Sequence, residues 1–323
     1  MKAILCKELG LPSKLVLEEI PSPIPGKKQV LVQIKACSLN FPDTLIIQGL
    51  YQFKPELPFS PGSDISGIVK AVGEGVKHVK VGDEVFGLVS HGGFAEEVLV
   101  PANSCFPKPP MMDHKIAASF MMAYGTSHHA LKDRAKLKAG ETLLVLGASG
   151  GVGLAAVELG KIVGAKVIAA ASTDEKLAIC KEKGADEVIN YTTEDLKKRV
   201  KELTGGKGAD VVYDPVGGAY TEAALRATAW EGRFLILGFP AGIAKIPMNL
   251  PLLKGCQIVG VFWGSFAMRS PQQNMANTME LIQMYAKGQL KPHIHATYSL
   301  ENAQKALEEM MERKVKGKVI IEP

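Results

Sequence analysis

The sequence predicts an α/β protein in which a doubly wound parallel sheet is joined to a second, β-rich domain. Three observations predict this fold class. Residues up to about 120 form short strand-like runs broken by Gly and Pro, and residues from about 140 alternate strand and helix patterns. A glycine-rich turn joins the first strand of that second series to its helix. At 323 residues, the chain is long enough for two such domains.

The first part of the chain is typical of an all-β, partly closed barrel. Strand-like runs cover ranges such as 29–35, 66–72 and 83–89, and the turns at 21–26 and 73–75 punctuate them. Because Gly and Pro interrupt the runs at short intervals, few helices are expected in this part.

The central part repeats the order strand, helix, strand, helix. The predicted strands are 142–146, 166–171, 187–190, 211–214, 233–237 and 257–261, and the predicted helices are 154–163, 174–182, 194–203 and 220–229. Short strands that alternate with helices of this length indicate a parallel, doubly wound sheet.

The last part contains two amphipathic helices, 271–288 and 301–313, followed by a strand at 318–321. Because the chain ends on a β-type segment, we expect its end to return to the first domain instead of extending the second.

Composition favours a globular enzyme and excludes several other classes. Hydrophobic residues make up 46% and charged residues 22%, with a net charge of +5. Lys and Arg are scattered, so no nucleic-acid or membrane partner is expected, and no apolar run approaches the ~18 residues of a membrane span. The cysteines are odd in number and form no C-x-x-C pair, which indicates free thiols in a reducing compartment, by default the cytoplasm. They are Cys6, Cys37, Cys105, Cys180 and Cys256.

The glycine-rich turn after the strand at 142–146 is the strongest functional signal. Gly150 is expected to let the backbone bend toward a pyrophosphate, and Gly153 to let the following helix pack closely on the strand. The free amides and the positive dipole end of that helix would then face the phosphates. The motif departs from G-x-G-x-x-G because Ala148 takes the place of the first glycine.

The end of the second strand indicates which dinucleotide is used. NAD sites usually place Asp or Glu there, whereas this chain has Ser172, which leaves room for a 2′-phosphate. Lys176, one helical turn further, is in reach of that phosphate. Asp174 is expected to cap the helix with its carboxylate turned onto its own backbone. The pattern favours NADPH over NADH, although Lys176 by itself also fits a solvated lysine on a helix surface.

Eight ordered segments resemble the zinc-free quinone oxidoreductase branch, which includes zeta-crystallin, of the medium-chain dehydrogenase/reductase superfamily. They are 38–43 (SLNFPD), 59–69 (FSPGSDISGIV), 81–86 (VGDEVF), 93–98 (GFAEEV), 123–126 (AYGT), 185–191 (ADEVINY), 214–218 (DPVGG) and 316–320 (KGKVI). The resemblance implies a GroES-like substrate and catalytic domain from residues 1–122 and 265–323, and a Rossmann-type dinucleotide-binding domain from 123–264. It also implies a homodimer, in which the apolar edge strand from Cys256 to Val261 is covered by a second copy.

The resemblance also implies a set of dinucleotide contacts. Tyr191 resembles the tyrosine that closes over the 2′-phosphate, although a core tyrosine that caps a strand fits equally well. The strand end at 261–263 resembles the segment whose backbone anchors the nicotinamide amide. The implied cofactor-binding residues are Thr126, Ala148, Ser149, Gly150, Gly151, Val152, Gly153, Ser172, Lys176, Tyr191, Gly238, Phe239, Val261, Phe262 and Trp263.

Zinc catalysis, used by alcohol dehydrogenases of the same superfamily, is not expected. Those enzymes need a Cys where this chain has Asn40 and a His where the triplet 62–64 reads Gly-Ser-Asp. The four-cysteine lobe that they insert after Val-Gly-Asp-Glu is missing too. The pair His128 and His129 does not replace these ligands, because neighbours on a helix point about 100° apart. Both are expected to be surface and packing residues, as are His293 and His295.

The expected reaction is hydride transfer from NADPH to a quinone or an α,β-unsaturated carbonyl. Conjugation stabilises the resulting anion, so a metal Lewis acid is unnecessary. Asn40 is the expected donor beside nicotinamide and substrate, and Tyr51 is the expected second donor or proton source. Asp43 is expected to be structural, and Leu45, where many relatives carry a larger residue, suggests a more apolar pocket.

Two alternatives stay open at this point. One is an enoyl thioester reductase acting on a CoA or acyl-carrier substrate. The other is a non-catalytic NADPH-binding or structural protein. The retention of Asn40 and Tyr51 argues against this second class.

Overall fold

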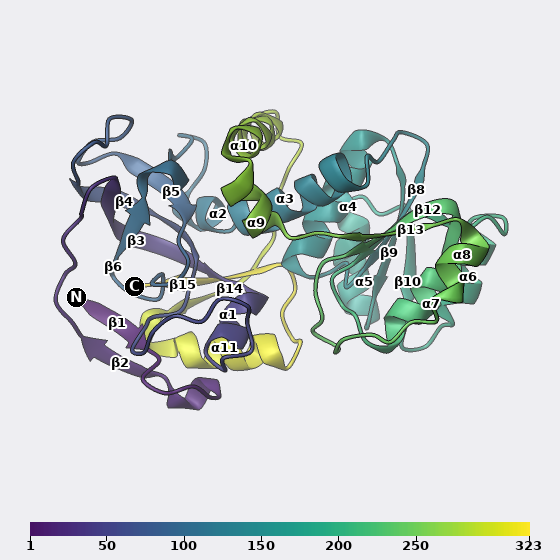
Figure 1. Cartoon of the computed structure of the whole chain (residues 1–323), viewed down its shortest axis with the longest axis horizontal. Coiled ribbons are helices and arrows are strands. Elements are labelled where there is room, and N and C mark those ends of the chain that lie inside the picture. Colours follow the sequence, from purple (N-terminus) through teal and green to yellow (C-terminus); the bar gives the residue numbers. More distant parts are fainter. The chain divides into compact units, whose positions relative to one another are not determined.

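The structure is a computed structural model that describes the whole chain, residues 1–323, and divides it into two compact units (Figure 1). Unit 1 consists of residues 1–122 and 292–323, and unit 2 of residues 123–291. None of the helices combines the length and apolar character needed to cross a membrane.

Unit 2 is built on a six-stranded parallel sheet with the strand order β10-β9-β8-β11-β12-β13. The chain enters at β8, moves outward to β10 and returns to β11 on the other side of β8. The strand order therefore reverses between β8 and β11, which is the position where such sheets bind ligands. The strands are β8 (Thr142–Leu146), β9 (Lys166–Ala171), β10 (Glu187–Asn190), β11 (Ala209–Asp214), β12 (Thr228–Ile236) and β13 (Gln257–Gly260).

Helices cover both faces of this sheet because its right-handed crossovers run in opposite directions from the centre. A sheet buried on both faces needs strands that are apolar along their length, and residues 143–146 of β8 are fully buried. The helices are α3 (Met121–His128), η3 (a π-helix, His129–Arg134), α4 (Gly151–Val163), α5 (Asp174–Glu182), α6 (Leu196–Leu203), α7 (Ala219–Ala227), α8 (Asn249–Lys254), α9 (Trp263–Arg269) and α10 (Pro271–Ala286).

Unit 1 is built on a seven-stranded sheet with the order β14-β15-β3-β4-β5-β7, in which β6 also pairs with β3. A separate antiparallel pair is formed by β1 and β2. The elements are β1 (Lys2–Leu5), η1 (Pro12–Lys14), β2 (Val16–Glu19), β3 (Gln29–Leu39), α1 (Phe41–Ile46), β4 (Asp64–Val72), β5 (Glu84–Leu88), β6 (Glu97–Pro101), η2 (Ala102–Ser104), β7 (Cys105–Pro107), α2 (His114–Ala118), β14 (Ile294–Ser299), η4 (Leu300–Asn302), α11 (Ala303–Met311) and β15 (Lys318–Glu322).

The predicted combination of a doubly wound parallel sheet with a β-rich domain is confirmed. The last strand, β15, pairs antiparallel with β3, so the end of the chain returns to unit 1 as its β-type ending predicted. Short elements such as α1, α2 and β14 were not predicted, because five or six residues give too little periodicity to distinguish a helix from a turn.

The compact units divide the chain differently from the boundary at residue 265 that the resemblance implied, because residues 265–291 belong to unit 2. The Asp133 side chain accepts hydrogen bonds from Gln273 (3.2 Å) and Asn277 (2.9 Å) of α10. A Cβ added at Gly125 would lie only 2.6 Å from the Trp263 ring, so this ring leaves space for nothing larger than glycine. These contacts attach α9 and α10 to the start of unit 2.

The burial of β15 side chains in the core of unit 1 makes a testable contribution to its stability. Ile321 is fully buried in the main core of this unit, and we expect Ile321→Ala to lower the free energy of unfolding by about 2–5 kcal/mol. Ile24→Ala is the matched control, because Ile24 is 88% exposed, and its effect should stay within about 0.5 kcal/mol. Thermal or urea unfolding of both variants checks this prediction, and equal effects would contradict it.

Candidate functional site

The first group of predicted site residues lies in unit 2, in the loop between β8 and α4. Gly147 makes the turn, because its φ of +54° lies in the left-handed region. Gly150 has extended backbone (φ −76°, ψ 170°) and is the N-cap of α4. The bend attributed to Gly150 is therefore made three residues earlier. A Cβ on Gly153 would lie 2.4 Å from the Gly147 carbonyl oxygen, which agrees with the close packing expected of Gly153.

The start of α4 provides free backbone amides. The first helical hydrogen bond is donated by Leu154 N–H to the Gly150 carbonyl (2.8 Å), so the amides of residues 151–153 precede the helical ladder. These amides and the helix dipole favour an anion at this end. Ser127 of α3, the chain neighbour of the predicted site residue Thr126, donates to the Val152 carbonyl (2.8 Å).

A second loop, at the carboxyl end of β11, was not assigned to the site from the sequence. The Asp214 carboxylate accepts hydrogen bonds from the backbone N–H of Val216 and of Gly217, both at 2.9 Å, and from the Thr221 hydroxyl (2.7 Å). Gly217 and the next residue, Gly218, both have positive φ. Since β11 pairs with β8, this loop lies at the same sheet edge as the glycine-rich turn. An Asp and two glycines after a predicted strand were the signal that could have identified it.

Ser172 and Lys176 are brought together at the carboxyl end of β9. The Lys176 ammonium donates a hydrogen bond to the Ser172 hydroxyl at 3.2 Å. The helix N-cap is Thr173, whose hydroxyl accepts from the Lys176 backbone N–H (3.3 Å). The prediction that Asp174 caps α5 is therefore wrong by one residue, because Thr173 already has the extended backbone that a cap needs. Asp174 instead accepts a hydrogen bond from the Asn190 amide (2.8 Å).

Tyr191 follows β10 and lies next to this pair. Its backbone N–H donates to the Ala171 carbonyl (3.2 Å), and its ring contacts Tyr220 with 4.3 Å between centroids. The adjacent Thr192 hydroxyl donates to the Ser172 carbonyl (3.0 Å). Tyr191 thus follows the end of a strand and also lies close to Ser172, so its position agrees with both interpretations of this residue.

The remaining predicted contacts follow β12 and β13. Residues 238–239 follow the end of β12 by one residue, and Val261 N–H donates to the Ile236 carbonyl at 2.9 Å, so both segments reach the carboxyl edge of the sheet. Phe262 is exposed, whereas Trp263 is buried and donates through Nε1 to Asn274 (3.0 Å). The Trp263 side chain is therefore used for packing.

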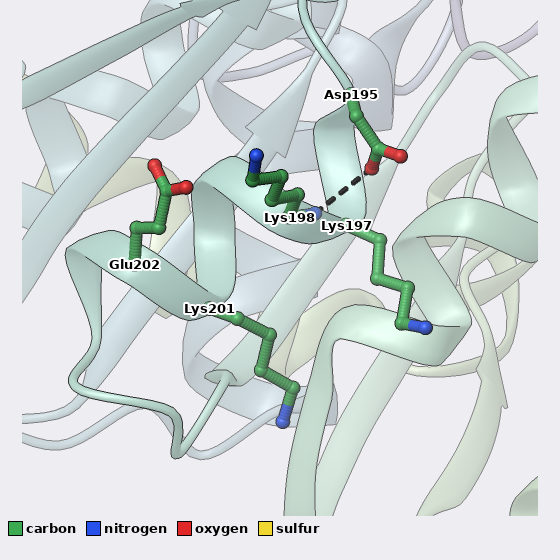
Figure 2. Close-up of a pocket in the computed structure, with 5 residues that line it drawn as sticks. All are labelled: Asp195, Lys197, Lys198, Lys201 and Glu202. Atoms are coloured by element: carbon green, nitrogen blue, oxygen red, sulfur yellow. Dashed lines mark hydrogen bonds between the residues drawn. The ribbon is translucent and has the colours of Figure 1, made fainter.

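A surface depression of about 520 Å³ lies over α6, away from these residues in the sequence (Figure 2). It is lined by Asp195, Lys197, Lys198, Lys201 and Glu202. Asp195 caps the helix by accepting from the Lys198 N–H at 2.9 Å. All five lining residues come from one helix and its cap, and none of them is a predicted site residue, so we do not place a site there.

The predicted catalytic residue Asn40 lies in unit 1, directly after β3, and is the N-cap of α1. Its backbone N–H donates to one oxygen of the Asp43 carboxylate (2.7 Å), and Gly62 N–H donates to the other (3.1 Å). Asp43 therefore ties the end of β3 to the turn before β4. This arrangement agrees with the structural role expected of Asp43.

The Asn40 side chain belongs to a buried polar group that we call the strand-end cluster: Asn40, Asp43, Asp64 and Lys318. The Lys318 ammonium donates to Asn40 Oδ1 and lies 3.8 Å from Asp64 Oδ2. Asn40 Nδ2 donates to the Ser38 carbonyl (3.2 Å). Sequence reasoning missed Lys318, because one lysine near the end of a chain carries no signal of burial.

Burial dominates the electrostatics of the cluster. It raises the pKa of Asp64 from 3.8 to about 7, although the nearby Lys318 ammonium opposes the shift, and it raises the pKa of Asp43 to about 6. Burial also lowers the pKa of Lys318, against the pull of the two carboxylates. The pKa of the Tyr51 phenol is raised, first by burial and then by the charge of Asp43, so Tyr51 lies within the field of this cluster and stays protonated at neutral pH.

The histidines and cysteines form no group of three that could hold a metal ion. His128 and His129 are both buried, so the prediction that they lie partly at the surface is corrected. His129 bonds to Asp133 (2.7 Å), and its ring stacks on Phe266 with 3.9 Å between centroids. His128 faces Glu280 at 3.5 Å. Each imidazole thus has its own packing role.

Comparison with known families and structures gives matches in both units. The alcohol dehydrogenase GroES-like domain matches residues 26–110, and the zinc-binding dehydrogenase family matches residues 151–283. A quinone oxidoreductase-like protein 2 homolog of Nematostella vectensis is 41% identical over 99% of this chain and 88% of the relative.

Two solved structures extend the similarity to the whole fold. A Pseudomonas syringae quinone oxidoreductase has a TM-score of 0.94 at 34% identity, covering 100% of this chain and 99% of the other. An Escherichia coli quinone oxidoreductase complexed with NADPH has a TM-score of 0.93 at 30% identity, covering 100% of both chains.

The raised pKa of Asp64 predicts a pH dependence of stability. The folded protein binds this proton with a pKa of about 7, against 3.8 ordinarily, so the contribution is fully present below about pH 4 and is lost as pH rises through about 7. Relative to Asp64→Asn, the wild type should therefore lose stability between about pH 4 and about pH 7. Thermal unfolding midpoints of the two proteins across this range test it, and parallel curves would contradict the shift.

Proposed function

Because the chain belongs to the quinone oxidoreductase branch of the medium-chain dehydrogenase/reductase superfamily, we propose that it is a zinc-independent, NADPH-dependent reductase of quinones or α,β-unsaturated carbonyls. The observation that carries the cofactor choice is the hydrogen bond from the Lys176 ammonium to Ser172 at the end of β9. At this position a carboxylate would favour NADH, and the nearest one, Asp174, is bonded to Asn190 instead.

The residues present fit a dinucleotide phosphate. The amides of residues 151–153 and the absence of a Cβ at Gly153 suit a pyrophosphate at the start of α4. Ser172 and Lys176 would hold the 2′-phosphate, with Tyr191 beside them. Thr126 and the segments 238–239 and 261–263 complete the proposed contacts. When bound, NADPH supplies the hydride from its nicotinamide ring.

In the proposed reaction, the chain's own contribution is to orient the acceptor and stabilise charge on its oxygen. The Asn40 amide has a second N–H besides the one that bonds to the Ser38 carbonyl, and this N–H interacts with the Asp64 carboxyl, whereas the Tyr51 phenol is protonated. Donors in a poorly solvated site act strongly on a developing oxyanion. A quinone or an enone needs no more than this, because conjugation spreads the charge that the hydride brings.

The strand-end cluster supports a reaction without zinc. Where zinc-dependent relatives need a thiolate and an imidazole, this chain has the amide of Asn40 and the hydroxyl of Ser63, which are poor zinc ligands. A cation is also already present, since the Lys318 ammonium bonds to Asn40 Oδ1. A second cation beside it would be repelled.

We also propose a homodimer and a reducing compartment such as the cytoplasm. β13 is an edge strand of its sheet, and apolar side chains of the preceding α8 and its cap, Met248, Leu252 and Leu253, are exposed. A second copy that covers this edge would satisfy the unpaired backbone groups of β13 and bury the exposed apolar side chains. All five cysteines are free and buried, as a reducing compartment would keep them.

The first test is NADPH oxidation by chelator-treated protein against a panel of quinones and enones, with NADH as the control cofactor. Turnover with NADPH would support the proposal. Tight NADPH binding without turnover would favour an enoyl thioester reductase or a non-catalytic binding protein, and turnover that depends on added zinc would reject zinc independence.

Lys176 should decide cofactor preference. Lys176→Ala removes a charged hydrogen-bond donor and should raise the Kd for NADPH roughly 10- to 100-fold while leaving NADH binding nearly unchanged. Lys198→Ala, which removes an exposed lysine of α6, is the matched control. Fluorescence titration measures both affinities, and an equal loss for the two cofactors would assign Lys176 a structural role.

Asn40 should affect turnover rather than cofactor binding. Asn40→Ala removes one donor to the acceptor oxygen and should lower kcat for an enone by roughly 100-fold, with NADPH affinity nearly unchanged. Asn103→Ala, an exposed asparagine of unit 1, serves as the control. Steady-state kinetics compares the two, and unaltered turnover in Asn40→Ala would remove Asn40 from the mechanism.

A further inference from the structure

The last residue of β10, Asn190, engages two carboxylates. Its side-chain Nδ2 donates a hydrogen bond to one oxygen of Asp174 at 2.8 Å. Its backbone N–H donates to the Glu194 carboxylate, also at 2.8 Å, and Glu194 is paired with Arg199 (2.9 Å) as well. One residue thus holds the acidic side chain at the start of α5 and the acidic side chain that follows β10.

The amide of Asn190 has a fixed orientation. Its side chain is buried, with 8% exposed, and its Oδ1 accepts from the Thr192 backbone N–H at 3.2 Å, which closes a turn after β10. A backbone N–H is only a donor and a carboxylate is only an acceptor, so both partners select the same orientation. The oxygen of the amide therefore faces Thr192, and the N–H faces Asp174.

Strand order places this contact beside the proposed cofactor site. β9 lies between β8 and β10, and Asn190 pairs with Ala171 at its end. On the other side, the glycine-rich loop is bonded to the same strand, because Ala148 N–H donates to the Ala170 carbonyl (3.0 Å). In a sheet of this kind the phosphates bind at that loop, and the adenosine ribose lies at the end of the next strand, which is followed here by Ser172.

We propose that Asn190 is a positioning residue for cofactor specificity, which engages the Asp174 carboxylate so that it neither accepts a ribose 2′-hydroxyl nor repels a 2′-phosphate. This role rests on the proposed function and deepens it. A carboxylate at the end of the second strand favours NADH. With Asp174 bonded toward β10, the groups that meet the 2′-position are Ser172 and Lys176, which are bonded to each other.

Local structure does not require the bond between Asn190 and Asp174. Thr173 already caps α5, and an acidic side chain in the first turn interacts with the helix dipole without a fixed partner. The turn at 190–192 uses only the oxygen of the Asn190 amide. Asp174 is exposed, so water could solvate its carboxylate, yet a buried amide donates to it. The direction in which the carboxylate is held accounts for this donor.

The test compares two probes that differ only at the 2′-position, adenosine 2′,5′-bisphosphate and adenosine 5′-monophosphate. Asn190→Asp keeps an oxygen for Thr192 and replaces the donor to Asp174 by a second carboxylate. It should lower the ratio of the two Kd values, measured by isothermal titration calorimetry, roughly 10-fold toward the monophosphate. Asn277→Asp is the matched control, because Asn277 is also buried and donates to a carboxylate, that of Asp133 (2.9 Å). It should keep the wild-type ratio.

An exchanged pair separates the bond from the added charge. Asn190→Asp combined with Asp174→Asn has the net charge of the wild type, and it restores the hydrogen bond with donor and acceptor reversed. The double variant should therefore recover most of the wild-type ratio. No recovery would assign the loss to a charge at position 190 and would overturn the inference, as would a wild-type ratio in Asn190→Asp.

A second variant covers poor folding of Asn190→Asp. Asn190→Ser offers a hydroxyl oxygen to the Thr192 turn but is too short to hold Asp174, so it should shift the ratio in the same direction. A wild type that binds both probes equally, or neither, would overturn the proposed NADPH dependence and this inference together. A wild type that prefers the bisphosphate, with the same preference in both Asn190 variants, would overturn the inference alone.

Discussion

The pairing of β3 with three other strands is the constraint on which the candidate catalytic group depends. The first half of β3 pairs with β6, its last three residues with β15, and nearly its whole length with β4. Residues that are 278 positions apart in the chain, Asn40 and Lys318, thereby meet in one hydrogen bond. A shift of one residue in the β15 register would turn Lys318 to the opposite face and put Gly317 or Val319 beside Asn40.

The strand-end cluster combines one ammonium group with two carboxyl groups in a poorly solvated place. Full ionisation of all three would leave a buried net negative charge, and the raised pKa values of Asp43 and Asp64 are the response to it. Asp43 is further stabilised by two backbone N–H groups, whereas one oxygen of Asp64 has no partner. Asp64 is therefore the group that takes up a proton at the higher pH.

In unit 2, groups that favour an anion lie at the carboxyl ends of the sheet strands. The start of α4 contributes backbone amides and a helix dipole, and Lys176 contributes a full charge held near Ser172. Asp214, the carboxylate nearest in the chain to the second loop, is engaged by two N–H groups and a hydroxyl. An edge with backbone amide donors, a lysine and hydrogen-bonded carboxylates is suited to a polyanionic ligand such as a dinucleotide phosphate.

The sequence by itself determined the local features of this protein. The apolar run at 142–146, the glycines at 150–153 and the helix at 174–182 depend on neighbouring residues, because strand period, helix period and turn chemistry are short-range properties. The Ser172 and Lys176 pair is equally local, since one helical turn separates them. Only the tertiary structure decided that Lys318 is buried against Asn40 and Asp64, and that α9 and α10 belong to unit 2. These facts depend on strand register and on packing between distant segments, and no pattern within a single segment carries that information.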